Sequence, residues 1–423
     1  ITVCANGCDY TSINDAIEDS SDGDVIQLAA ETYFEGDEID TDGKKITLRG
    51  VLNKAGEPAS VLDGAEEHRV LHCNSDETDA TSFENLVIQN GSADVGGGMF
   101  NNNSSPTLTN CTFTGNSADE RGGGMYNKNN ANPTLTDCTF TDNSADEDGG
   151  GMHNLSSCSP TLNDCAFTNN SAALDGGGMY NGGYENYDSN PTLTNCTFTE
   201  NSAEYGGGMY NSNRTSPTLT NCSFTNNTAT SGGGMSNIGS SSSPTLTYCT
   251  FTSNSVEFSG GGVMNNSYNE GEPFFYNCTF TSNSAGVGGG MKNYGSRTIV
   301  IGCTFTDNSA EFDGGGMSNF NYPCSGPGCT GDESNVADPI LAGCTFTDNS
   351  ADEDGGGMHN DFSSPYLANC TFTSNSADED GGGMYNSAGS SPELTDCAFT
   401  SNSAEFGGGM YNLSSTGGGV PYA

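Results

Sequence analysis

The stretch Asn110-Cys-Thr-Phe-Thr-Gly-Asn-Ser-Ala-Asp-Glu-Arg-Gly-Gly-Gly-Met-Tyr-Asn127 recurs with drift from about residue 83 to residue 412. Each of the 12 methionines follows a glycine run in one copy of it, and most successive copies lie 26 or 27 residues apart. A residue type that is used at one position of a repeat and nowhere else indicates a repeat array. The 423 residues therefore predict one elongated domain of stacked repeats and not a low-complexity chain.

The alternation of apolar side chains within one copy predicts three short strands per turn. If Leu108 faces inward, its threonine neighbours face outward, because side chains alternate along a strand. A bend at Asn110 resets the phase, so that Cys111 and Phe113 face inward on the second strand. Met125 then faces inward on the third strand. The pattern predicts an all-β, three-sided parallel β-helix of about a dozen regular rungs.

The first 70 residues differ from the repeats and predict an N-terminal cap. Residues 9–19 place Ile13, Ala16 and Ile17 on one face of a short amphipathic helix, which is followed by irregular strands. We therefore expect a cap over residues 1–70, a repeat β-helix over 71–412, and a C-terminal tail without a cap over 413–423. An uncovered last rung would pair with another copy of the chain, so head-to-tail self-association is expected.

The charge balance excludes one class of partner. The chain has 10 Lys and Arg against 54 Asp and Glu, a net charge of -44, whereas nucleic-acid binding needs basic side chains. The sequence contains no apolar run of about 18 residues, and it therefore predicts no transmembrane helix. The chain starts at Ile1 without an initiator Met, so we expect an extracellular or cell-surface protein whose signal peptide has been removed.

The chain has 17 cysteines, and 11 of them occupy one repeat position between Cys111 and Cys397. This ladder predicts either small apolar core residues or disulfides between neighbouring rungs. Two close pairs in loops predict local disulfides in an exported protein, namely Cys4 with Cys8 and Cys324 with Cys329. Cys158 has no counterpart in the loops of neighbouring rungs and could cross-link two chains.

Two recurring motifs carry a family resemblance. The first is Phe113-Thr-Gly-Asn116 with its successors, and the second is the glycine run before each methionine. With the opening at residues 9–17 and 22–26, the chain resembles right-handed parallel β-helix surface proteins that have polymorphic-membrane-protein-type repeats and a pectate-lyase-like N-terminal cap. The resemblance implies a right-handed solenoid. Because this architecture serves adhesins, lyases and structural proteins alike, function must be argued from sites.

Acidic residues precede most glycine runs and would stack into a carboxylate strip. Such a strip is either a solvated face or a site for Ca²⁺, which takes oxygen ligands in flexible geometry. The candidate ligands are Asp146, Glu147, Asp148, Asp352, Glu353, Asp354, Asp378, Glu379 and Asp380.

Insertions between the Met strand and the Leu strand would emerge along one edge, where a solenoid usually binds. The candidate binding residues there are Tyr184, Tyr187, Phe320 and Tyr322. Outward Thr-Phe-Thr runs predict either ordinary strand preference or an ice-binding face.

Taken together, the sequence predicts an extracellular structural protein, a self-assembling filament or surface-layer subunit. The main alternative is an adhesin or glycan-binding surface protein, and a polysaccharide lyase or hydrolase and an ice-binding protein remain as further alternatives. Basic residues are few in the array, and no rung breaks the repeat with a catalytic cluster. We therefore expect the chain not to be an enzyme.

Overall fold

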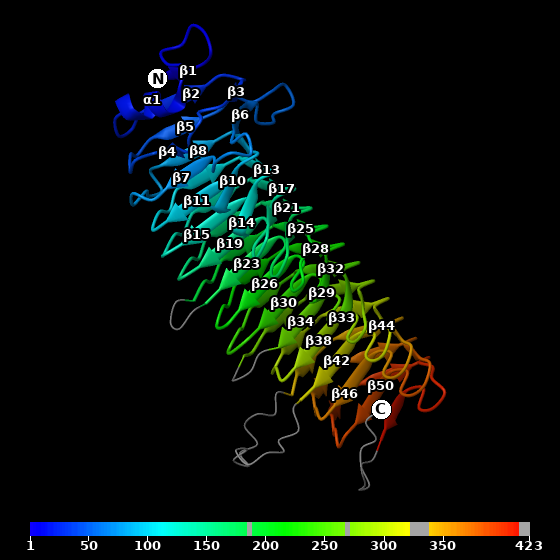
Figure 1. Ribbon diagram of the computed structural model, residues 1–423. Helices are drawn as coiled ribbons and strands as arrows, with labels where there is room; N and C mark the ends of the chain where they lie inside the picture. The colour runs from blue at the N-terminus through cyan, green and yellow to red at the C-terminus, as the bar shows by residue number, and fades with distance from the viewer. Residues whose placement is uncertain (184–187, 267–270, 322–337, 414–423) are drawn as a thin grey trace. The chain divides into compact units, whose positions relative to one another are not determined.

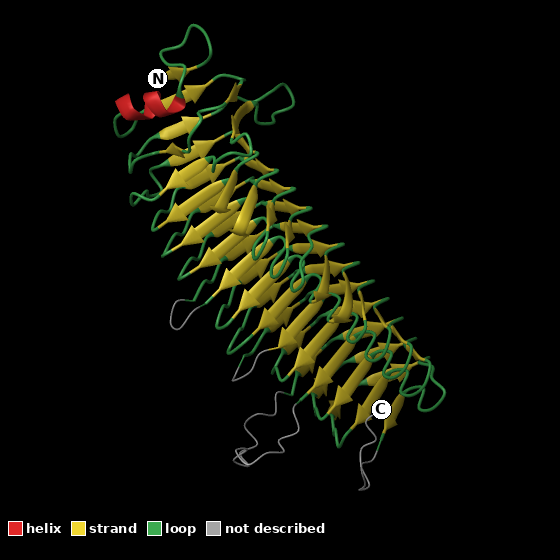
Figure 2. Cartoon of the chain, in the orientation of Figure 1, coloured by secondary structure: helices red, strands yellow, loops and turns green. Residues whose placement is uncertain are grey.

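The computed structural model describes residues 1–183, 188–266, 271–321 and 338–413. The chain divides into two compact units, Ile1–Ile238 with Ser242–Thr245, and Gly239–Ser241 with Leu246–Ala423. Both units are parallel β-solenoids, and the single helix of the described chain lies in the N-terminal cap (Figures 1 and 2). The predicted all-β parallel β-helix is confirmed.

In the first unit the strands form three main sheets, which we name by their inward residue. The Leu sheet has the order β1 (Thr2–Val3), β2 (Val25–Leu28), β5 (Thr47–Arg49), β8 (Ser82–Glu84), β12 (Thr107–Thr109), β16 (Thr134–Thr136), β20 (Thr161–Asn163), β24 (Thr192–Thr194) and β27 (Thr218–Thr220). The Phe sheet has the order β3 (Thr32–Tyr33), β6 (Ser60–Asp63), β9 (Leu86–Gln89), β13 (Thr112–Thr114), β17 (Thr139–Thr141), β21 (Ala166–Thr168), β25 (Thr197–Thr199) and β28 (Ser223–Thr225). The Met sheet has the order β4 (Ile39–Asp40), β7 (Leu71–Cys73), β11 (Met99–Asn102), β15 (Met125–Lys128), β19 (Met152–Leu155), β23 (Met179–Gly182), β26 (Met209–Ser212) and β30 (Met235–Ile238).

The second unit repeats this arrangement. Its Leu sheet contains β31 (Thr245–Thr247), which begins at the last residue of the first unit, and then β35 (Phe274–Tyr276), β39 (Ile299–Ile301), β43 (Ile340–Ala342), β47 (Tyr366–Ala368) and β51 (Glu393–Thr395). Its Phe sheet has the order β32 (Thr250–Thr252), β36 (Thr279–Thr281), β40 (Thr304–Thr306), β44 (Thr345–Thr347), β48 (Thr371–Thr373) and β52 (Ala398–Thr400). Its Met sheet has the order β34 (Val263–Asn266), β38 (Met291–Tyr294), β42 (Met317–Phe320), β46 (Met358–Asp361), β50 (Met384–Ser387) and β53 (Met410–Asn412).

A fourth set of short strands, which we call the corner strands, lies between the Phe and Met strands of a rung. The sequence did not predict them. In the first unit they are β10 (Ser92–Val95), β14 (Ser117–Arg121), β18 (Ser144–Ala145), β22 (Ser171–Ala172) and β29 (Thr228–Ser231). In the second unit they are β33 (Ser255–Ser259), β37 (Ser284–Ala285), β41 (Ser309–Ala310), β45 (Ser350–Ala351) and β49 (Ser376–Ala377).

The core consists of identical residues stacked from rung to rung, as the repeat predicts. Leu108, Phe113 and Met125 are fully buried, and Asn110 has a φ of 51° at the predicted bend. The Phe113 and Phe140 rings stack with centroids 4.7 Å apart and planes within 3°. This separation equals the strand spacing, so the rings continue the ladder of the sheet. The ladder cysteines of the described chain are free thiols.

One methionine does not take the inward position of the Met sheet. Val263 pairs with Met291 and is fully buried, while Met264 pairs with Lys292 and faces outward. Val263 directly follows the glycine triplet and therefore takes the inward position. The prediction that every methionine after a glycine run lies at one position is wrong there.

Two asparagine ladders close the corners of each unit. In the first unit, the Nδ2 of Asn143 donates to the Oδ1 of Asn170 at 2.9 Å, and the Nδ2 of Asn170 donates to the Oδ1 of Asn201 at 3.0 Å. These side chains are fully buried, and each also bonds backbone groups. The ladders therefore satisfy turn groups that would otherwise be buried without partners.

The cap helix α1 (Ile13–Asp19) covers the first rung as predicted, with Ile13, Ala16 and Ile17 buried. Ser12 is its N-cap. Glu35 accepts from the first backbone amide of the helix, and the ammonium of Lys44 donates to carbonyls at its C-terminal end. Both ends of the helix are thus held by charges of the sign that its dipole favours.

Candidate functional site

The outward face of the Leu sheet changes character between the units. In the first unit its outward positions are mostly Thr, as in Thr107 and Thr109 of β12. In the second unit four consecutive strands, β35, β39, β43 and β47, pair in register with apolar outward residues. We call this surface the apolar Leu-sheet face. Its outward residues are Phe274, Tyr276, Ile299, Ile301, Ile340, Ala342, Tyr366 and Ala368.

Aromatic rings at both ends of this face are open to solvent. Tyr276 is 38% exposed and Tyr366 is 40% exposed. Tyr248 stands beside Tyr276, with ring centroids 6.0 Å apart and an interplanar angle of 71°. None of the eight outward positions is charged, and the face ends at Glu393, which pairs with Tyr366. An uncharged surface of aromatic and aliphatic groups suits a neutral amphipathic ligand.

The size of the face also limits its ligand. Three strand spacings of about 4.8 Å separate β35 from β47, so the face is about 14 Å long and, at three residues per strand, about 10 Å wide. Stable protein interfaces take roughly 800 Å² from each partner. A face of this size therefore fits a ligand narrower than a folded protein.

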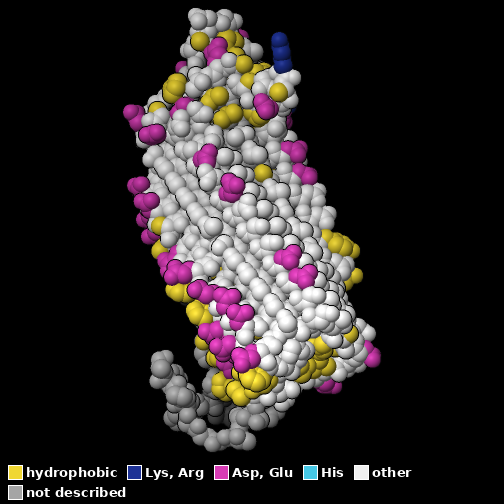
Figure 3. Space-filling model, turned by 90° about the vertical axis from the view of Figure 1, so that its right-hand side faces the viewer, with side chains coloured by type: hydrophobic (Ala, Val, Ile, Leu, Met, Phe, Trp, Pro, Cys, Tyr) yellow, Lys and Arg dark blue, Asp and Glu magenta, His cyan; other side chains and the backbone are white. Residues whose placement is uncertain are grey.

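The predicted acidic strip exists, but its members differ in burial. Figure 3 shows Asp and Glu side chains gathered along one edge of the face in view. In each predicted triplet the third acid is half-buried and the first is exposed. The half-buried residues are Asp148, Asp354 and Asp380, and the exposed ones are Asp146, Asp352 and Asp378. Glu353 and Glu379 are exposed and Glu147 is half-buried.

No metal geometry accompanies the strip. Within the described ranges, no group of three or more His, Cys, Asp or Glu residues could hold a metal ion. Arg121 instead pairs with Glu147 at 2.6 Å and with Asp148 at 3.3 Å. Calcium binding remains a prediction.

In the first unit, aromatic residues that follow the methionines form a covered column. Tyr126 is 3% exposed and His153 is 1% exposed, and the His153 ring stacks on Tyr180 with centroids 4.4 Å apart. Burial lowers the pKa of His153 well below its usual value, and its Nδ1 has no hydrogen-bond partner. Burial, with further effects of Asp148 and Glu204, raises the pKa of Asp175 to about 7.

The second unit has a related column with a lysine. The Nζ of Lys292 donates to the Ser318 hydroxyl at 2.9 Å, and burial lowers the pKa of Lys292 to about 8. Burial and Asp354 raise the pKa of Asp313 to about 7. Burial lowers the pKa of His359 to about 3. These groups titrate near neutral pH or stay neutral there, but they are half-buried or buried, so ligand access is poorer than at the apolar Leu-sheet face.

The remaining candidates divide between described and undescribed residues. Tyr184, Tyr187, Tyr322, Cys324 and Cys329 lie outside the described residues. Phe320 is half-buried and stacks on Tyr294 with centroids 5.0 Å apart.

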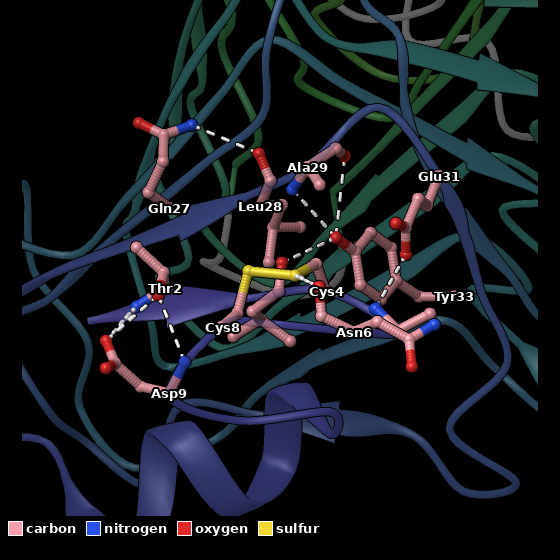
Figure 4. The surroundings of a disulfide bond; sticks show 12 residues. Thr2, Cys4, Asn6, Cys8, Asp9, Gln27, Leu28, Ala29, Glu31 and Tyr33 are labelled. Atoms are coloured by element: carbon pink, nitrogen blue, oxygen red, sulfur yellow. Dashed lines mark hydrogen bonds between the residues drawn. A yellow bond between two sulfur atoms is a disulfide. The ribbon is translucent and has the colours of Figure 1, made fainter.

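Two loop cysteines can be placed. Cys4 and Cys8 form the predicted disulfide, beside the Tyr33 hydroxyl that donates to the Val3 carbonyl (Figure 4). Cys158 is fully buried, and its thiol donates to the Leu155 carbonyl, so a cross-link to another chain would require its loop to open. No helix of the described residues is long and apolar enough to span a membrane.

Comparisons with solved structures bear on the fold. The chain is similar to the Azotobacter vinelandii mannuronan C-5 epimerase AlgE6 A-module, with 14% identity over 91% of this chain and 92% of that one and a TM-score of 0.38. It is similar to a PL6 alginate lyase in complex with a trisaccharide, with 11% identity over 93% and 81% and a TM-score of 0.38. A third is the Siphovirus 9NA tailspike receptor binding domain, with 10% identity over 98% and 76% and a TM-score of 0.35. At such identities and TM-scores the likeness carries no conclusion about function.

One expectation from the sequence is corrected by these comparisons. The similar solved structures are mainly enzymes, among them epimerases, polysaccharide lyases and an α-1,3-glucanase. The expectation that the chain is not an enzyme is therefore contradicted. It rested on the scarcity of basic residues in the array and on the regularity of the repeats.

No curated protein sequence matches the chain. The family model for the right handed beta helix region matches residues 71–186, 176–310 and 237–419, which together span most of the chain. The chain therefore belongs to the right-handed β-helix family.

Proposed function

We propose that the protein is a surface protein that binds a neutral glycan, and that the apolar Leu-sheet face is its binding surface. The observation that carries the proposal is the change of outward residues on four adjacent strands, from threonine in the first unit to aromatic and aliphatic residues in the second. Location at the cell surface after export is part of the same proposal.

The chemistry of the face suits a sugar ring. A pyranose ring has an apolar face of C–H groups and a rim of hydroxyls. The rings of Tyr276 and Tyr366 offer flat apolar area for the first, and their phenol groups can donate to the second. The eight outward positions lack charge, and the net charge of -44 would repel an anionic polymer. A neutral glycan is therefore the expected ligand.

The flatness of the face favours a chain over a single sugar. Tyr276 and Tyr366 lie three strands apart, so one short oligosaccharide could contact both rings. Contacts made by linked units strengthen one another, because the second contact is intramolecular. We expect affinity to rise with the length of the oligosaccharide until it spans the face.

The test is a glycan array followed by calorimetry on any neutral oligosaccharide retained. Tyr276→Ala and Tyr366→Ala should each weaken binding by about 1 kcal/mol. The double variant should weaken it by about 2 kcal/mol, which is more than a tenfold rise in Kd. Thr134→Ala changes an outward Leu-sheet residue of the first unit and serves as the matched control. Unchanged affinity in the double variant would overturn the proposal.

A second candidate is self-assembly into a filament or surface layer. The same uncharged face favours it, since two copies of so acidic a chain would approach most easily through a surface without carboxylates, but the face is smaller than a stable interface, so further contacts would have to add to it. Sedimentation velocity at rising protein concentration separates the two functions. Self-assembly predicts larger species that Tyr276→Ala reduces, and glycan binding predicts no dependence of association on this residue.

A further inference from the structure

The outward face of the Phe sheet in the second unit keeps one residue type over five of its six strands, and only the last strand, β52, departs from it, at Ala398. Five consecutive strands, β32, β36, β40, β44 and β48, each read Thr-Phe-Thr with the phenylalanine inward. They pair residue by residue without a shift of register. All ten outward positions are therefore threonine. They are Thr250, Thr252, Thr279, Thr281, Thr304, Thr306, Thr345, Thr347, Thr371 and Thr373.

Inheritance of the repeat does not explain this uniformity. In four of these five rungs the outward positions of the Leu sheet have drifted to Phe, Tyr, Ile and Ala, and only β31 keeps its threonines. In the first unit the same columns of the Phe sheet include Ala166 and Ser223. Strand preference does not explain it either, because Val, Ile and Tyr suit an outward strand position as well as Thr does.

The threonines form a flat lattice with two fixed repeats. Neighbouring strands are about 4.8 Å apart, and the two threonines of one strand are about 6.6 Å apart, so five strands give two rows about 19 Å long. A rigid base lies beneath, because successive phenylalanine rings of these strands stack with centroids 4.6–4.9 Å apart and planes within 4°. The hydroxyls and methyls therefore hold their positions without a ligand.

The lattice also lacks charge. The chain has 54 acidic residues, yet the first acids beside the lattice are Asp307 and Asp348. They lie at the bend directly after the second threonine of β40 and of β44. A charged group orients water around itself. A fixed hydroxyl instead bonds one water molecule, while the adjacent methyl keeps its neighbours at a distance. Rows of such groups can hold water in a crystal-like layer, since water that bridges fixed polar groups is strongly localised.

From this geometry we propose that the Thr face of the second unit, these ten residues on β32 to β48, binds the surface of ice. Its ligand is the oxygen lattice of solid water, whose repeat distances lie close to the two spacings of the threonines. Many weak contacts formed together would hold the protein on a growing crystal. This inference does not depend on the glycan-binding proposal, which concerns a different sheet.

The test is ice growth in the presence of the purified full-length chain. Thermal hysteresis and inhibition of ice recrystallisation should both be observed for the wild-type protein. Thr304→Tyr places a ring at the centre of the face and should abolish both effects. Thr247→Tyr makes the same replacement at an outward position of β31 on the Leu sheet, and it should leave both effects unchanged.

A second variant guards against loss of folding. Thr345→Lys adds a flexible charge to a neighbouring strand without altering the core, and it should also abolish the effect on ice. Circular dichroism and thermal unfolding establish that each variant is folded. The inference is overturned if the wild-type chain leaves ice growth unchanged, if a folded Thr304→Tyr or Thr345→Lys variant is as active as wild type, or if Thr247→Tyr loses the activity.

Discussion

Replacing Asn170 by Ala should destabilise the first unit far more than an ordinary surface substitution. The Asn170 side chain is fully buried and takes part in four hydrogen bonds. Its Nδ2 donates to the Phe140 carbonyl at 2.9 Å and to the Asn201 Oδ1 at 3.0 Å. Its Oδ1 accepts from the backbone N–H of Asn143 at 3.1 Å and from the Asn143 Nδ2 at 2.9 Å.

The magnitude follows from the groups left behind. A buried group that loses its partner costs about 1–3 kcal/mol. In Asn170→Ala the backbone N–H of Asn143 loses its side-chain acceptor, and the Phe140 carbonyl loses its side-chain donor. Water that enters the vacated space would recover part of this cost. We therefore expect a loss of about 3 kcal/mol in the free energy of unfolding.

The assay is equilibrium unfolding in urea, followed by circular dichroism, with the loss read from the shift of the midpoint at constant slope. Asn163→Ala is the control, because Asn163 is a half-buried outward residue of β20 and its replacement should cost less than about 0.5 kcal/mol. A loss below about 1 kcal/mol for Asn170→Ala would show that the ladder does not stabilise the turns.

Three further substitutions test other parts of the molecule. Glu77 accepts hydrogen bonds from Thr41, Gly43, Ser75 and Ser104 in the cap, so Glu77→Ala should lower the free energy of unfolding by about 3 kcal/mol in the same assay. The pKa of Asp175 is raised to about 7, so the stability that this carboxyl contributes is present below its unfolded pKa and is lost as pH rises through 7. Asp175→Asn should therefore flatten the decline of the thermal midpoint between about pH 4 and pH 8. An unchanged slope of the midpoint against pH would contradict this. If the acidic strip binds Ca²⁺, millimolar CaCl₂ should raise the thermal midpoint more than matched MgCl₂ does, and Asp352→Asn should reduce the difference. Equal shifts with both salts would favour a solvated acidic face.

The regular rungs could be predicted because local signals agree. The alternation around Leu108, the bend at Asn110 and the stacked Phe113 all gave the correct strand, turn and core position. The failure at Met264 has a physical reason. The residue directly after the glycine triplet faces inward, and in this rung that residue is Val263. Residue identity was a weaker guide there than spacing.

The covered columns could not be predicted, because their cover is not local. The alternation placed His153 on the outside of the Met sheet, and it does face away from the core. Its burial arises from packing between rungs. The His153 ring stacks on Tyr180 and meets Tyr126 edge to face, and its Nε2 lies 3.9 Å from the Asp148 carboxylate. No short-range pattern in one repeat reports such packing.

The apolar Leu-sheet face, by contrast, had a signal in the sequence. The Thr-Leu-Thr pattern of the repeat becomes Phe274-Phe-Tyr276 in one copy and Ile299-Val-Ile301 in another. A search for catalytic residues passes over this change, because it introduces no acid, base or nucleophile. Four neighbouring strands carry it, so only the register of the sheet shows that the changed residues form one surface.

The most direct test of glycan binding is retention of the protein on insoluble neutral polysaccharides, compared with anionic ones. The account predicts that the wild-type chain and Thr134→Ala are retained on at least one neutral polymer, and that the Tyr276→Ala, Tyr366→Ala double variant is released from it. Retention on anionic polymers only, or equal retention of the double variant and the wild type, would contradict the account.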